Sequence, residues 1–307
     1  MDIEAFLRRI GVGEYDGPPR LEGLSQLHAA YVDTVPYETV QYQFGQGGPL
    51  EPEAAAKRII AREAGGYCFQ LNGSFALLLT ELGYHVKMHR GGVQTPNHPG
   101  DVDASHMVLT VSGLVEDPER EWLVDVGLGD GLVTPMPLEP GSAHQEPFDL
   151  RLRPSEKVDG WRVDFDPRSS LVGMDFESAP VGLDAFAAQH ARLSVDPGLP
   201  FVGLACAFRR KAASVVVLRS VGLMETFADR VDNSIIETPA DYFATLADVF
   251  QLPLAHLDAT HRDQLWRRVW SQYEAFLARQ SAFTAAQDDD GSGAGGPLQG
   301  KAVGRTV

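Results

Sequence analysis

The chain has 307 residues, of which 44% are hydrophobic and 22% charged, and its 26 Lys and Arg against 42 Asp and Glu give a formal net charge of −16. This composition excludes collagen-like, coiled-coil and intrinsically disordered chains, and the length predicts two or three domains. The acidic balance repels nucleic-acid backbones and anionic membranes, so neither is expected as a partner. The charged N-terminus Met1–Ile10 predicts no signal peptide, and we expect no membrane span.

Apolar residues at helical spacing recur through the first 83 residues. One stripe follows Ile3, Phe6, Leu7 and Ile10, and further helices are expected over 24–31, 52–60 and 71–82. Gly-Pro-Pro at 17–19 and the pair Gly65-Gly66 interrupt these patterns. The pattern predicts a small helical bundle over residues 1–83.

The spacing then changes to short runs rich in β-formers, expected as strands over 86–93, 107–115, 121–126 and 161–165. Together they predict an antiparallel barrel or sheet over residues 84–195. A strand over 215–221 and a helix over 255–283 predict an α/β unit at 196–284, and the polar, glycine-rich residues 285–307 predict a disordered tail. This order of elements predicts an α+β fold.

Cys68 is the candidate nucleophile. It follows Gly65-Gly66-Tyr67 and begins a helix, where unpaired N–H groups and the positive end of the helix dipole favour a thiolate. The glycines let the backbone turn sharply beneath the side chain. Taken alone, a free cysteine such as Cys68 is more often a small buried hydrophobe. With Cys206 as the second of only two cysteines, no disulfide framework is expected, and a reducing, cytoplasmic setting follows.

A nucleophilic cysteine needs a base and a group that orients the base. His106 opens the apolar strand 106–111, and Asp125 follows 19 residues later at the end of the run Trp122–Val124. A carboxylate at the end of a buried strand is costly unless paired, and an imidazole on the adjacent strand would pair it. A solvated histidine and a turn-capping aspartate are the alternatives. The chain order Cys, His, Asp is nevertheless the one used by papain-like and transglutaminase-like enzymes.

Four segments in this order resemble the arylamine N-acetyltransferase family: Val35–Glu38, Gly65–Phe69, His106 at the start of its strand, and Val124–Gly129. The resemblance covers about residues 1–280. It implies a helical bundle, a β-barrel and an α/β lid around a cysteine-protease-like core, with Cys68 as nucleophile, His106 as base and Asp125 as orienter. It also implies two-step transfer of an acyl group from acetyl-CoA, or another acyl-CoA, through a thioester on Cys68 to a small aromatic amine or hydrazine, as in xenobiotic metabolism.

Several positions depart from the family pattern. Ala64 and Gln70 stand where the family usually has Arg and Glu, and losing both members of a charge pair leaves no unpaired charge. Leu128 stands where an aromatic residue is common, and the Pro-Phe-Glu-Asn motif is altered at Tyr37 and Thr39. The resemblance makes Tyr37, Phe69 and Leu128 candidates for substrate binding, although Phe69 can equally pack inside the bundle.

Cofactor contacts have weaker signals. Gly127 and Gly129 let the backbone approach a pyrophosphate, and Arg209, in the run Arg209–Lys211, can meet the phosphates of CoA. A loop after a strand and a solvated basic turn are the alternatives. His85 and His89 have no carboxylate or thiol at ligand spacing, so no metal is expected.

Three other functions remain open on the sequence. The first is an amide synthase of macrolactam biosynthesis, which takes an acyl chain from a carrier protein and closes it onto an internal arylamine; Ala64, Gln70 and Leu128 do not decide between this and the transferase. The second is a papain-like or transglutaminase-like cysteine hydrolase acting on peptides. The third is a non-catalytic binding module that retains the fold.

Overall fold

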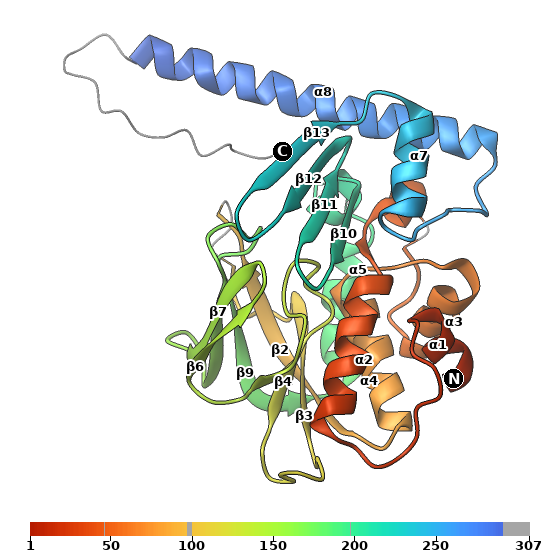
Figure 1. Ribbon diagram of the computed structural model, residues 1–307. Helices are drawn as coiled ribbons and strands as arrows, with labels where there is room; N and C mark the ends of the chain where they lie inside the picture. Colours follow the sequence, from red (N-terminus) through yellow and green to blue (C-terminus); the bar gives the residue numbers. More distant parts are fainter. Residues whose placement is uncertain (46, 97–99, 197, 291–307) are drawn as a thin grey trace.

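The computed structural model describes residues 1–45, 47–96, 100–196 and 198–290. Its helices and two antiparallel sheets are arranged as a helical region beside a large curved sheet, with a smaller sheet and two helices above them (Figure 1). The predicted α+β fold is confirmed. None of the helices within the described ranges is long and apolar enough to cross a membrane.

The helical region lies where the sequence predicts it. Asp2 caps the first helix by accepting the N–H of Ala5 at 2.9 Å, and Pro52 occupies the first turn of the third, where no intrahelical N–H partner is needed. The predicted helices are confirmed, although two of them begin earlier than their apolar stripes. Their bounds are α1 (Ile3–Arg9), α2 (Leu21–Thr34), α3 (Pro52–Arg62) and α4 (Cys68–Glu81), with a 3-10 helix η1 (Val40–Phe44).

The larger sheet has eight antiparallel strands in the order β5-β4-β3-β2-β9-β8-β7-β6. The strand β3 is buried on both faces. Met107 and Leu109 pack with the helical core, whereas Val108 packs inside the curved sheet. This two-sided burial explains the unbroken apolar run of that strand. The bounds are β2 (His85–Gln94), β3 (His106–Ser112), β4 (Trp122–Val124), β5 (Met136–Pro137), β6 (Gly141–Gln145), β7 (Phe148–Pro154), β8 (Gly160–Asp164) and β9 (Gly173–Val181).

The smaller sheet combines segments from the two ends of the chain. Its order is β1-β10-β11-β12-β13, and its first strand comes from the helical region, where Thr39 accepts the N–H of Cys206 at 3.0 Å. One face packs against α7 and α8; in Figure 1 α7 lies beside the sheet and α8 crosses above it. The bounds are β1 (Tyr37–Glu38), β10 (Cys206–Arg210), β11 (Val215–Arg219), β12 (Gly222–Thr226), β13 (Val231–Ile235), α7 (Pro239–Asp248) and α8 (Ala259–Asp290).

The predicted division of the chain into domains at residues 1–83, 84–195 and 196–284 stays a prediction. Two segments lie close to its boundaries. The linking elements η2 (Leu183–Phe186) and α5 (Ala187–Leu193) pack on the helical core through Phe186 and Leu193, and α6 (Pro200–Gly203) follows. The helix α8 runs to Asp290 and therefore includes the first six residues of the predicted disordered tail, where Ala285 and Ala286 favour helix. The rest of that tail, 291–307, lies outside the described residues.

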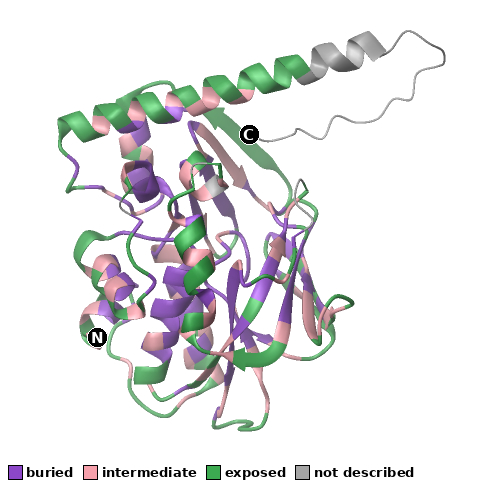
Figure 2. Ribbon diagram, turned by 180° about the vertical axis from the view of Figure 1, so that it is seen from behind, coloured by how far each residue is buried: buried purple, intermediate pink, exposed green. Residues whose placement is uncertain are grey.

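Burial is concentrated where the helices meet the larger sheet (Figure 2). The helix α4 is buried along most of its length because the other helices and β3 cover it from different sides. Its first residue, Cys68, is only 3% exposed. The N-terminus of α4 is therefore fixed by surrounding structure rather than free to adjust.

Candidate active site

The backbone before Cys68 passes unusually close to β1. A Cβ on Gly65 would lie 1.9 Å from the carbonyl oxygen of Pro36, so only glycine allows this approach. The N–H of Glu38 donates to the carbonyl of Gly66 at 2.8 Å. Tyr67 is extended, and its side chain accepts no hydrogen bond from the first N–H groups of α4, so no capping side chain occupies the end of the helix at Cys68.

The structure brings Cys68, His106 and Asp125 together in one buried network. Nε2 of His106 donates to Oδ2 of Asp125 at 2.7 Å, and both side chains are at most 3% exposed. The other ring nitrogen is thereby left for the thiol, and Cys68 is close enough to His106 to contribute to the raised pKa of that ring. The thiol also lies 3.8 Å from the carbonyl oxygen of Ser105. The arrangement has the order of groups that nucleophilic cysteine chemistry needs.

Opposing effects set the pKa of His106. Burial alone lowers it, but the Asp125 carboxylate, the charge of Cys68 and hydrogen bonds to both raise the pKa of His106 to about 10. The imidazole therefore holds its proton across the neutral range. A cationic imidazole beside the sulfur favours a thiolate–imidazolium pair.

The Asp125 carboxylate has more partners than the sequence predicts. In addition to His106, Oδ1 accepts from Nδ2 of Asn72 at 2.8 Å and from the backbone N–H of Gly127 at 2.9 Å. Asn72 also donates to the carbonyl of Met107 at 2.6 Å and accepts from the N–H of Val126 at 2.8 Å. These contacts fix both the carboxylate and the strand that bears His106.

His28, from α2, holds the two ends of the segment that follows β4. Its Nε2 accepts the backbone N–H of Asp125 at 3.3 Å, and its Nδ1 donates to the carbonyl of Val133 at 2.8 Å. Burial lowers the pKa of His28 to about 4, despite the hydrogen bond to Val133 and the charge of Asp125. The ring is therefore neutral at pH 7, and only the neutral ring can make both contacts.

Gly127 allows this segment to pack on the start of α4. A Cβ at this position would lie 2.8 Å from the Cα of Cys68 and 2.8 Å from Nδ2 of Asn72. Gly129 has a left-handed φ of 79°, and a Cβ there would lie 2.9 Å from the ring of Phe208. Both glycines thus have a packing reason, and their predicted contact with a pyrophosphate stays a prediction.

Arg209 and Arg210 project to opposite faces of β10. Arg209 forms an ion pair with Asp33 at 3.2 Å and donates to the carbonyl of Val249 at 2.8 Å, so its predicted contact with CoA, which stays a prediction, would have to displace these bonds. Arg210 is 2% exposed and donates to the carbonyls of Gly131, Gln145, Glu146 and Lys211. It therefore fixes the segment after Asp125.

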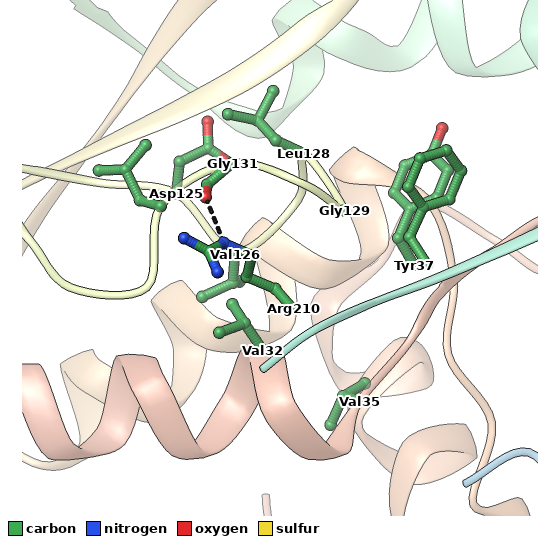
Figure 3. A pocket seen from close by; sticks show the side chains of 11 residues that line it. Val32, Val35, Tyr37, Asp125, Val126, Leu128, Gly129, Gly131 and Arg210 are labelled. Carbon is green, nitrogen blue, oxygen red and sulfur yellow. Dashed lines mark hydrogen bonds between the residues drawn. The ribbon is translucent and has the colours of Figure 1, made fainter. Parts of the chain in front are cut away.

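A small cavity lies between α2, β10 and the segment after β4 (Figure 3). Tyr37 and Leu128, two of the residues predicted to bind substrate, line it together with Asp125, Arg210 and Phe208. The third, Phe69, is fully buried, and its ring lies 5.2 Å from that of Tyr67 and 5.3 Å from that of Phe186. Phe69 thus packs in the core, and substrate binding by all three stays a prediction.

The departures at Ala64 and Gln70 are compensated by Arg58 of α3. Its guanidinium donates to Oε1 of Gln70 at 2.8 Å and to the carbonyl of Gly65 at 2.9 Å. Ala64 is buried at 1% exposure. A cation from a different helix therefore supports the turn that precedes Cys68. Among the described residues, no group of three or more His, Cys, Asp or Glu side chains could hold a metal ion.

A family model described as N-acetyltransferase matches residues 20–259. The chain is 27% identical over 248 residues to arylamine N-acetyltransferase 1 of Oryctolagus cuniculus, covering 74% of this chain and 83% of that protein. It is 32% identical over 157 residues to proansamycin X synthase of Amycolatopsis mediterranei, covering 49% of this chain and 58% of that protein.

Among solved structures, the chain is similar to the arylamine N-acetyltransferase of Mycobacterium marinum in complex with CoA. The TM-score is 0.78 at 26% sequence identity, and the match covers 87% of this chain and 98% of that chain.

Proposed function

This chain belongs to the arylamine N-acetyltransferase family, and from that premise we propose that it transfers an acetyl group from acetyl-CoA to a small aromatic amine or hydrazine through a thioester on Cys68. The observation that carries the proposal is the buried pair in which His106 bonds to Asp125 at 2.7 Å, next to the Cys68 thiol at the start of α4. A cytoplasmic location also belongs to the proposal, and the two free cysteines support it.

In the first half-reaction the Cys68 thiolate attacks the carbonyl carbon of the acyl-CoA thioester. A C–S bond to Cys68 forms, and the developing oxyanion is held by the backbone N–H of Cys68 at the start of α4. When the intermediate collapses, the bond to the CoA sulfur breaks. The imidazolium of His106 then gives its proton to the departing sulfur, which leaves as free CoA.

In the second half-reaction the amine attacks the acyl carbon on Cys68. His106, now neutral, accepts a proton from the attacking nitrogen, and Cys68 departs as the thiolate. The products are the amide and the original thiolate–imidazolium pair. Asp125 keeps the Nε2–H of His106 directed to itself throughout, so the other ring nitrogen exchanges the proton.

Initial rates with acetyl-CoA and aniline test this proposal. Varying both substrates should give parallel double-reciprocal lines, because CoA leaves before the amine reacts. Cys68→Ala should remove activity, whereas Cys206→Ser should retain it, since serine can keep the hydrogen bond to Thr39. Intersecting lines, or activity in Cys68→Ala, would contradict the proposal.

The acyl donor has a second candidate, a carrier-bound thioester. The partial match to proansamycin X synthase, 32% identical over 58% of that relative, is the reason to test it. Transfer from an acylated carrier protein, combined with no turnover of acetyl-CoA, would replace the proposed donor and keep the Cys68 thioester. Cleavage of peptides without any acyl-CoA would instead indicate a cysteine hydrolase.

A further inference from the structure

One face of the smaller sheet is directed toward the segment that follows Asp125. Cross-strand partners share a face, and the pairs Cys206↔Arg219 and Phe208↔Val217 place four side chains together. Phe208 and Val217 belong to a small apolar cluster with Phe148, from β7 of the larger sheet. Arg219 therefore lies on the face that looks toward the candidate active site, whereas Leu218 lies on the face covered by α7 and α8.

A continuous series of contacts connects Cys68 with Arg219. Tyr37 pairs with Gly66, two residues before Cys68, in a β-bridge. The Tyr37 ring meets the Phe208 ring edge-on, with centroids 5.4 Å apart and an interplanar angle of 80°. The guanidinium carbon of Arg219 lies 5.1 Å from the centroid of Phe208. Two aromatic rings thus form a wall that begins beside the nucleophile and ends at a cation.

Arg219 differs from the neighbouring arginines in its polar contacts. Arg209 and Arg210 are bound to Asp33 and to backbone carbonyls, as described above. Arg219 is half-buried, and within the described ranges no hydrogen bond or ion pair involves its guanidinium, which lies over the Phe208 ring and acts by its charge on the Cys206 thiol. A guanidinium presents five donors in a planar fork. This fork is therefore free for an acceptor from outside the protein.

We propose that Arg219 binds an anionic oxygen group of a substrate that lies along the Tyr37–Phe208 wall. The inference rests on the proposed function, because it assumes that the substrate reacts at Cys68. The planar fork matches the geometry of a carboxylate or a phosphate, and its position on an aromatic face limits its freedom before binding. An aromatic surface that ends in a cation fits an aromatic ring that carries an acidic substituent, because rings pack face-to-edge as well as in parallel.

Two substrates of the proposed reaction can carry such a group. One is an acceptor amine with a carboxylate, and the other is the acyl donor, whose CoA portion carries phosphates. In a two-step transfer both occupy the space beside Cys68 in turn. The shared chemistry is an oxyanion held by Arg219, and the source is decided by comparing charged and neutral substrates of similar shape.

The acceptor is tested with 4-aminobenzoate and its neutral analogue 4-aminobenzamide. The measured quantity is the acceptor ratio, which is kcat/KM for 4-aminobenzoate divided by kcat/KM for 4-aminobenzamide. It is measured in the wild type, Arg219→Gln and Arg219→Lys. Because a charge-assisted bond is lost, the ratio should fall about tenfold in Arg219→Gln. Arg219→Lys should give a ratio between those of the wild type and Arg219→Gln, since it keeps the charge without the fork.

The donor is tested by comparing acylation of Cys68 by acetyl-CoA and by S-acetylpantetheine, which has no phosphate. The donor ratio is the acylation rate with acetyl-CoA divided by the rate with S-acetylpantetheine.

Arg230→Gln is the matched control. Arg230 also lies over an aromatic ring, that of Phe227 at 3.8 Å, but it has ion pairs with Asp229 and Asp232. Both substrate ratios should be unchanged in this variant. A fall in the acceptor ratio assigns the anion to the amine, and a fall in the donor ratio assigns it to the phosphates. If neither ratio falls in Arg219→Gln, the inference is wrong.

Equilibrium binding separates this inference from the proposed function. In a Cys68→Ala background no turnover occurs, and the Kd values of 4-aminobenzoate, 4-aminobenzamide, CoA and pantetheine can be measured with and without Arg219→Gln. Selective weakening of a charged ligand supports Arg219 even if the wild type transfers acetyl to no amine. Equal Kd changes for charged and neutral ligands would overturn the inference while leaving the acyl transfer intact.

Discussion

The two sides of Cys68 differ in how completely their polar groups are paired. On one side, His106 and Asp125 are buried, and the carboxylate of Asp125 accepts three hydrogen bonds. On the other side, toward Tyr37 and the smaller sheet, Arg219 is half-buried and has its donors free. The hydrogen bonds of the first side are complete without a ligand, whereas on the second side the guanidinium of Arg219 lacks a hydrogen-bond acceptor.

This difference separates two tasks. In the proposed reaction, the groups that must keep one geometry through both half-reactions are held by the protein's own hydrogen bonds, which leaves little to be reorganised. Groups that select a substrate must exchange partners, so their bonds are left for the ligand. Disturbing the first side should therefore reduce the rate for every substrate, and disturbing the second should change only the preference.

Asp125→Asn should have the largest effect on the paired side. Without the carboxylate charge, the pKa of His106 should fall from about 10 toward 6.5, because burial then meets less opposition. The imidazole loses its fixed orientation, and kcat/KM should fall by about 10³-fold or more for charged and neutral amines alike. Titration of the His106 ring by NMR checks the first result, and initial rates check the second.

The same shift has a consequence for stability. Since the pKa of His106 is raised on folding, protonation of His106 stabilises the folded protein fully below pH 6.5, and that contribution disappears as the pH rises through about 10. In Asp125→Asn this contribution should be smaller. A His106 pKa that stays near 10 in Asp125→Asn would show that the carboxylate does not hold the proton.

Gly127→Ala should have the next largest effect, because it moves the proposed nucleophile, Cys68, without removing any functional group. The added Cβ would lie 2.8 Å from the Cα of Cys68, so one of the two segments must shift. We expect the free energy of unfolding to fall by about 1–3 kcal/mol and kcat/KM by about 10- to 100-fold. Urea unfolding and initial rates measure these changes.

Gly13→Ala is the control for this substitution. A Cβ at Gly13 would meet no atom within 4 Å, and its φ is not left-handed. Its activity should equal that of the wild type, and its stability should change by less than about 0.5 kcal/mol. If Gly127→Ala behaves like Gly13→Ala, close packing of the two segments is not what positions Cys68.

His28→Phe should have the smallest effect on the rate. Phenylalanine keeps the ring but leaves the N–H of Asp125 and the carbonyl of Val133 without their partner. We expect kcat/KM to fall by about tenfold, with KM little changed, since the displaced segment carries Asp125. His28→Gln retains a donor and an acceptor and should recover part of the loss.

The pH dependence of stability identifies His28 independently of the rate. The pKa of His28 falls to about 4 on folding, so His28 in the unfolded chain is protonated at a higher pH than in the folded protein. Wild-type stability should therefore decrease by about 3 kcal/mol as the pH drops from 6.5 to 4. His28→Phe lacks this contribution. Urea unfolding at pH 7 and pH 4.5 should therefore show the difference between the two proteins narrowing at the lower pH.

The sequence predicts the paired side of the site better than the other side. Cys68, His106 and Asp125 each have a local signal: a Gly-Gly turn before a helix, a strand start and a strand end. Asn72 also had one, because it is four residues after Cys68 and therefore on the same face of α4. His28 had none, because it falls within the apolar pattern of α2 and its partner Asp125 is 97 residues away.

The smaller sheet shows why the rest was not predicted. β13 is exposed along its whole length and has no alternation of apolar and polar burial, so its sequence resembles a loop. β1 has two residues and is a strand only because β10 pairs with it. Arg219 becomes notable only when Phe208, from another strand, lies beneath it. Such features depend on contacts distant in sequence, which local spacing does not encode.

Intact-protein mass spectrometry after brief exposure to acetyl-CoA tests the central claim most directly. The wild type should gain one acetyl group and lose it on addition of an arylamine, Cys206→Ser should do the same, and Cys68→Ala should gain none. An acetyl group on Cys68→Ala, or amide formation by the wild type without any acetylated protein, would contradict a thioester on Cys68.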